Sequence, residues 1–117
     1  MNGQPLEKVH VLFIPTQHGW EVPAYLRWGN WNACPPPEYH VAALRQWHDR
    51  FGAELVGMTG DRMDVHVASP PASRDAALGT AKEIYRYCPD IVDQGTGTLS
   101  ALAAAMVSGH WWNFWWD

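Results

Sequence analysis

At residues 54–68 the chain reads ELVGMTGDRMDVHVA, and this stretch decides the fold. Apolar and polar residues alternate from Met63 to Val67, which is the period of a strand with one covered face. Such a strand favours an antiparallel sheet, because one side of that kind of sheet can face water. The turn-forming pair between the two apolar runs therefore predicts a hairpin, made of residues 54–59, Gly60-Asp61 and residues 62–68.

The segments on either side of the hairpin predict three helices and two further strands. Apolar residues recur at helical spacing, with stop signals after them, at 38–51, 73–88 and 99–108. Short runs rich in β-branched and aromatic residues lie at 9–15 and 110–116. The predicted order is β-α-β-β-α-(α)-β over a single domain, residues 1–117. This is a ferredoxin-like α+β fold, in which a four-stranded antiparallel sheet with a central first strand carries the helices on one face.

Composition and charge narrow the possible function classes. The 117 residues include eight basic and twelve acidic side chains, which gives a net charge of −4. Nucleic-acid binders neutralise phosphates with clustered cations, so we expect no nucleic-acid partner. The longest apolar run, residues 101–107, is far shorter than the roughly 20 residues that cross a bilayer. No secretion signal is visible, so we expect a cytoplasmic protein without a membrane partner.

Eight tryptophans are unusual in a chain of this length, and their positions divide them into three sets. The predicted core set is Trp47, Trp112 and Trp116; the set on the proline-containing segment 16–37 is Trp20, Trp28 and Trp31; the set on the outward face of the last strand is Trp111 and Trp115. The third set is predicted to lie beside His66. Either it forms an exposed binding patch, or the segment 16–37 folds over it.

A nucleophilic cysteine is the first catalytic hypothesis. Cys34 ends the stretch WGNWNAC, residues 28–34, and His18 and His40 lie close to it in sequence. A cysteine becomes reactive when a neighbouring imidazole lowers the pKa of its thiol. The alternative is a buried structural thiol, because spacing alone identifies no third, orienting group. In a reducing cytosol Cys34 and Cys88 are expected to stay free thiols.

A carboxylate pair is the second catalytic hypothesis. Asp90 and Asp93 lie in the stretch CPDIVDQG, residues 88–95. Paired carboxylates can divide acid and base work or hold a hard cation, whereas the alternative is ordinary turn formation. The six histidines contain no pair with the spacing of a zinc-binding helix, so we expect no metal site and no cofactor.

Long strings of uncommon residues resemble a bacterial family, the domain of unknown function DUF4253. The strings are residues 18–24, 28–35, 87–95 and 114–117, and the resemblance extends over nearly the whole chain. The resemblance implies a bacterial, cytoplasmic domain and supplies no activity. Its strings are predicted to lie in loops, where binding and catalytic residues concentrate. The resulting candidate site residues are Trp28, Asn30, Trp31, Asn32, Cys34, Asp90, Asp93 and Gln94.

These observations favour a non-catalytic binding module for a polar small ligand or a partner protein. Indole rings offer contact area at low rotamer cost, and amides add directional hydrogen bonds. The expected ligand-binding residues are Trp28, Asn30, Trp31, Asn32 and Gln94. The alternative is a small hydrolase or transferase that uses Cys34 or the Asp90/Asp93 pair. A third hypothesis is a structural domain that oligomerises through its last strand.

Overall fold

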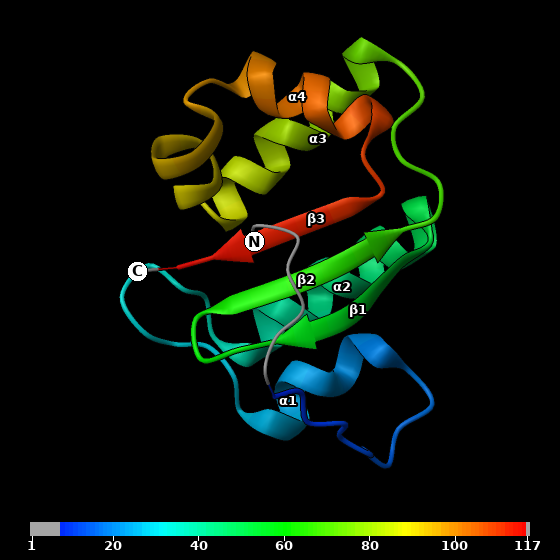
Figure 1. Ribbon diagram of the computed structural model, residues 1–117, viewed down its shortest axis with the longest axis vertical. Helices are drawn as coiled ribbons and strands as arrows, with labels where there is room; N and C mark the ends of the chain where they lie inside the picture. Colours follow the sequence, from blue (N-terminus) through cyan, green and yellow to red (C-terminus); the bar gives the residue numbers. More distant parts are fainter. Residues whose placement is uncertain (1–7, 117) are drawn as a thin grey trace.

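The fold is described by a computed structural model that places residues 8–116 (Figure 1). The elements in chain order are the 3₁₀ turn η1 (Gly19–Glu21), α1 (Val22–Leu26), α2 (Pro37–Phe51), β1 (Ala53–Met58), β2 (Arg62–Val67), α3 (Arg74–Tyr87), the π-helical turn η2 (Val92–Thr96), α4 (Leu99–Ser108) and β3 (Trp111–Trp115). The predicted α+β class is therefore confirmed. So are the three helices, the hairpin and the last strand, to within a few residues at their ends.

The sheet has three antiparallel strands in the order β1-β2-β3, so β2 is central. The predicted hairpin is present and pairs Met58 with Met63, and a bulge follows Leu55 in β1. β3 pairs with β2 so that Trp111 lies opposite His66. The predicted four-stranded sheet with a central first strand is wrong, because no strand precedes β1 in residues 8–116.

One face of the sheet forms the core. The alternate residues of β2 are fully buried, and on β3 the predicted inward residues Trp112, Phe114 and Trp116 are buried as well. From α2, Leu44 and Trp47 pack into the same core. Figure 1 shows α2 behind β1 and β2, and α3 beside α4 on the far side of β3. These helices cover the apolar side of the sheet, which explains why only one face of β2 needs polar residues.

Residues 9–15, predicted to form a buried strand, are extended but unpaired. Thr16 N donates to Ile14 O at 2.7 Å, and the Tyr25 hydroxyl donates to Pro15 O at 3.2 Å. The bond from Tyr25 holds the base of the segment at α1, and the residues before it have no neighbouring strand in residues 8–116. β propensity reflects packing on a sheet and does not itself supply a partner strand. An apolar run of strand-forming residues is therefore not enough to predict a paired strand.

The segment 16–37 is partly helical, since it holds η1 and α1. It does not cover the outward face of β3. Trp111 is 52 % exposed and lies edge-on to the His66 ring, with ring centroids 5.0 Å apart. The tryptophans of the segment pack on the other side of the sheet, against residues of α2 and the end of β3.

Candidate functional site

The loop before α2 is shaped by three residues with positive φ. These are Gly29 at 121°, Asn30 at 68° and Asn32 at 46°. Asparagine tolerates left-handed backbone better than other side chains, whereas the Gly29 conformation suits glycine alone. A Cβ on Gly29 would lie 2.4 Å from Pro35 O and 2.9 Å from the His40 ring. The loop is therefore folded tightly around the first turn of α2.

This folding brings Cys34 against His40. Cys34 Sγ lies 3.3 Å from His40 Nε2, and His40 Nδ1 lies 2.5 Å from the Tyr87 hydroxyl. His40 is fully buried and Cys34 is 4 % exposed. The chain of contacts joins the loop, α2 and α3, and it supplies the third group that spacing alone did not identify. Both ring nitrogens of His40 therefore have partners. This matches a neutral imidazole, which has one N–H donor and one acceptor nitrogen.

Burial sets the protonation states of these three side chains. Desolvation raises the pKa of Cys34 to about 12 and lowers the pKa of His40 to about 4. Desolvation also raises the pKa of Tyr87 well above its usual value. At neutral pH the three groups are a thiol, a neutral imidazole and a phenol. The geometry resembles that of a nucleophilic cysteine, but the site disfavours the thiolate that such chemistry needs.

Aromatic rings enclose this chain of contacts. The Trp28 and Trp116 rings lie edge-on to His40, with centroids 4.9 and 5.1 Å away. Each indole N–H in the group donates to a backbone carbonyl: Trp28 to Thr59 at 2.8 Å, Trp31 to Trp116 at 3.4 Å and Trp116 to Tyr87 at 3.3 Å. We call the set Trp28, Trp31, Cys34, His40, Tyr87 and Trp116 the His40 cluster. Because their N–H groups have backbone acceptors, Trp28 and Trp31 act as structural anchors of the loop.

The remaining predicted site residues lie in the loop that carries Cys34 and just after α3. Asn30 and Asn32 are exposed residues of the loop, in which Asn30 N donates to Pro35 O at 2.9 Å. Around the C-terminal end of α3, the end that also carries Tyr87, the Tyr85 hydroxyl donates to Asp93 at 3.0 Å and Gln94 donates to Asp90 at 3.3 Å. The predicted carboxylate pair therefore has local partners around η2.

Sequence reasoning missed Tyr87, although it placed His40 near Cys34. Tyr87 is 47 residues from His40, and only the folding of the chain brings them together. One indication was present, because Tyr87 begins the string 87–95 that carries the family resemblance.

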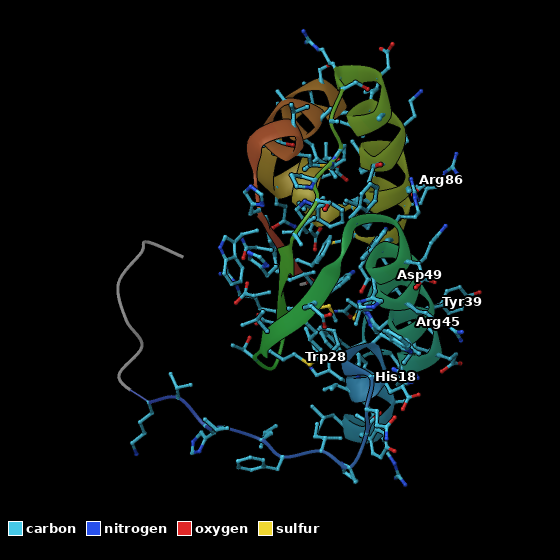
Figure 2. All side chains as sticks on the ribbon, turned by 90° about the vertical axis from the view of Figure 1, so that its right-hand side faces the viewer. His18, Trp28, Tyr39, Arg45, Asp49 and Arg86 are labelled. Carbon is cyan, nitrogen blue, oxygen red and sulfur yellow. The ribbon has the colours of Figure 1, made fainter. Side chains whose placement is uncertain are left out.

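An open groove of about 560 Å³ runs between α2 and α3 beside the His40 cluster. Trp47 and Tyr87 lie along it, and the loop closes one end. Its other lining residues are Ala33, Pro35, Pro36, Tyr39, Ala42, Ala43, Gln46, Glu83 and Arg86. Figure 2 shows Tyr39 and Arg86 directed outward on the same side of the molecule, from α2 and α3 respectively. We call this feature the α2–α3 groove.

The two charged side chains that line the α2–α3 groove, Glu83 and Arg86, differ in whether they form an ion pair. Glu83 is paired with Arg50, with Oε2 and Nη1 2.7 Å apart. Arg86 is exposed and forms no ion pair within residues 8–116. The groove therefore combines an apolar floor with one available cation, a combination typical of sites that orient a ligand by a single charged contact.

A second recess of about 310 Å³ lies between β3, η2 and α4. None of its lining residues is charged, and Trp112 is one of them. In the described part of the chain, Trp112 Nε1 is the buried side-chain nitrogen or oxygen without a hydrogen-bond partner. An unsatisfied buried donor lowers stability, so this indole contrasts with the satisfied ones of the His40 cluster.

Residues 8–116 contain neither a candidate metal-binding group nor a candidate membrane-spanning helix. No group of three histidine, cysteine, aspartate or glutamate side chains lies close enough there to hold a metal ion. No helix in that range has the length and apolar character needed to cross a membrane.

Comparisons with known proteins give one match. Residues 10–117 match a family model described as Domain of unknown function (DUF4253). No curated protein and no solved structure matches the chain. The family match covers essentially the whole chain, as the resemblance of its loop strings predicts, and the protein belongs to the DUF4253 family.

Proposed function

We propose that this protein is a non-catalytic binding module and that its binding surface is the α2–α3 groove. The observation that carries the proposal is the apolar floor of Trp47 and Tyr87 beside the unpaired Arg86 guanidinium. The tryptophan- and asparagine-rich loop has an indirect role, because it closes one end of the groove through Ala33, Pro35 and Pro36.

The ligand chemistry follows from the lining of the α2–α3 groove. An apolar floor favours an apolar group, and the single free cation favours an anion next to it. A small organic acid and an acidic, apolar segment of a partner protein share this chemistry. A nucleic acid does not suit the surface, because the chain has a net charge of −4 and the groove offers one cation. We place this binding in the bacterial cytoplasm, as the family resemblance implies.

A fluorescent probe with the same chemistry tests the proposal. We expect 8-anilinonaphthalene-1-sulfonate, an apolar anion, to bind the native protein saturably at neutral pH. Arg86→Gln should weaken that binding at least tenfold. Arg74→Gln is the matched control, since Arg74 is an exposed arginine at the other end of α3, and it should change binding less than twofold. Absence of saturable binding, or equal weakening by both substitutions, would contradict the proposal.

The contact chain Cys34–His40–Tyr87 supports a second candidate, a small hydrolase or transferase with Cys34 as nucleophile. The raised pKa of the Cys34 thiol opposes it. The carboxylate form of this candidate, with Asp90 and Asp93, has less support because these residues bond to Gln94 and Tyr85.

Alkylation rates separate the two candidates. In the binding module we expect iodoacetamide at pH 6 to leave Cys34 and Cys88 unmodified until urea unfolds the chain. Peptide mapping by mass spectrometry assigns any label to one cysteine. Labelling of native Cys34 faster than free cysteine would replace the binding proposal with the enzyme.

A further inference from the structure

Residues 9–14, VHVLFI, form an exposed apolar segment that we call the N-terminal arm. Phe13 is 94 % exposed and Val11 is 75 % exposed, and Val9 and Leu12 are also exposed. Figure 2 shows this stretch as an extended ribbon that runs away from the rest of the molecule. Soluble monomers rarely expose a contiguous apolar surface of this kind, and where they do it marks an interaction site.

The arm is fixed at its base and free along its length. Thr16 Oγ1 donates to Glu21 at 2.6 Å, and the Tyr25 hydroxyl holds Pro15 O, so the chain is tied to η1 and α1 at residues 15–16. Within residues 8–116, no hydrogen bond holds residues 9–13. A strand-forming sequence is therefore presented with its backbone groups unpaired.

β1 offers a receiving edge of matching length. It is an edge strand of six residues, and nothing in residues 8–116 pairs with its outer side. Val56 of β1 is 61 % exposed. A groove of about 350 Å³, lined by arm residues, by Val22 and Leu26 of α1 and by the second half of β1, lies alongside this edge. An open edge strand is a template for pairing with another strand.

We propose that two copies of this chain exchange their N-terminal arms, each arm adding as a strand to β1 of the other copy. The apolar pattern of the arm favours a second copy over its own β1. Val9, Val11 and Phe13 lie on one face of an extended strand, and Leu12 and Ile14 lie on the other. A strand that is apolar on both faces is typical of one covered on both sides. In the exchanged arrangement, α1 of one copy covers one face of the arm, and the second copy covers the other face.

Reciprocal exchange also gives a closed assembly. Each copy carries one arm and one free β1 edge, so a two-fold arrangement uses both arms and both edges. Main-chain hydrogen bonds supply the pairing, and alternate side chains supply its specificity.

Light scattering after size-exclusion chromatography tests the exchange on the full chain. We expect the wild-type protein at about 200 µM to have the mass of two chains. Phe13→Asp should give a monomer with an unchanged far-UV circular dichroism spectrum, because the substituted side chain is exposed. Val56→Lys, a charge on the receiving edge, should also give a monomer. Trp111→Asp is the matched control on β3 and should remain dimeric.

Each other outcome overturns the proposal. A monomeric wild-type protein, or a dimer that survives Phe13→Asp, excludes arm exchange. A dimer lost only in Trp111→Asp assigns association to the last strand. If the wild type is a monomer and the double variant Val11→Cys/Val56→Cys closes a disulfide within one chain, the arm pairs with its own β1. The native cysteines are buried and do not compete in that experiment.

Discussion

The His40 cluster and the N-terminal arm are both rich in apolar side chains, yet the cluster is largely buried and the arm is largely exposed. Sequence patterning assigns the arm to a buried central strand and places residues 28–35, which we call the tryptophan loop, in a loop. In the protein, the loop packs around a fully buried histidine, and Phe13 of the arm is almost completely exposed. Local apolar content therefore does not decide which of the two is buried.

The two regions differ in whether their polar atoms have partners. In the His40 cluster the indole N–H groups of Trp28, Trp31 and Trp116 reach backbone carbonyls, and both nitrogens of His40 are engaged. In the arm, residues 9–13 have no such bonds. Burial of a polar group without a partner is costly, so burial of an apolar segment is favoured where the fold also completes its hydrogen bonds. The following substitutions test this difference.

The largest effect is expected at Gly29. Gly29→Ala places a methyl group against Pro35 O and His40 and strains a φ of 121°, so we expect a loss of about 4 kcal/mol in unfolding free energy. Gly97→Ala is strained but uncrowded and should cost about 1.5 kcal/mol. Gly60→Ala is neither and should change stability by less than about 0.5 kcal/mol. Urea denaturation measures all three, and equal losses would show that the loop is not packed tightly on His40.

The next effect is a pH dependence that originates at His40. The pKa of His40 is about 4 in the folded protein and 6.5 as its ordinary value, so the unfolded chain binds more protons between these limits. Stability should fall on acidification, by about 2 kcal/mol between pH 7.5 and pH 5.

Two histidine variants isolate this contribution. His40→Asn should remove that part of the pH dependence, whatever it does to stability at neutral pH. His18→Gln, at an exposed histidine, should retain it. If the slope of unfolding free energy against pH is the same in both variants, His40 is not held neutral by burial.

A smaller effect is expected from the Tyr87 hydroxyl. Tyr87→Phe leaves His40 Nδ1 without its partner, so we expect a loss of about 1.5 kcal/mol. Replacement of Trp112, whose N–H already lacks a partner, is the matched control. An isosteric naphthyl-alanine at position 112 should be neutral or slightly stabilising by thermal unfolding. If the substitution at Trp112 lowers the unfolding free energy more than Tyr87→Phe does, completed hydrogen bonds do not explain which side chains stabilise the core.

The sequence predicts the elements whose evidence is local. The hairpin follows from the alternation between Met63 and Val67, and α3 from its apolar spacing and its cap, where Ser73 Oγ accepts from Ala76 N at 3.2 Å. The inward side of β3 follows from the number of aromatic rings on each face. Each of these patterns depends on the geometry of a single element, so the sequence alone is enough to predict it.

The rest depends on contacts between distant residues. Residues 9–15 have the composition of a strand, but a strand also needs an edge and two covers, which composition cannot place. Tyr87 reaches His40 only once the chain has folded. Glycine is required at position 29 because its φ is 121° and because Pro35 O and His40 lie against it. The predicted carboxylate pair is plausible as chemistry, but its local partners are set by the π-helical turn that follows α3.

The smallest effect is expected in the arm itself. At about 1 µM, in dilute solution where light scattering finds single chains, Phe13→Asp should change the unfolding free energy by less than about 0.5 kcal/mol, since the side chain is 94 % exposed. At about 200 µM the same substitution should abolish any rise in wild-type stability with concentration, because association stabilises by mass action. A loss above 1 kcal/mol in the dilute protein would mean that Phe13 already packs against its own chain. The arm would then be a buried segment like the tryptophan loop, and completion of hydrogen bonds would no longer explain why only one of the two regions is buried.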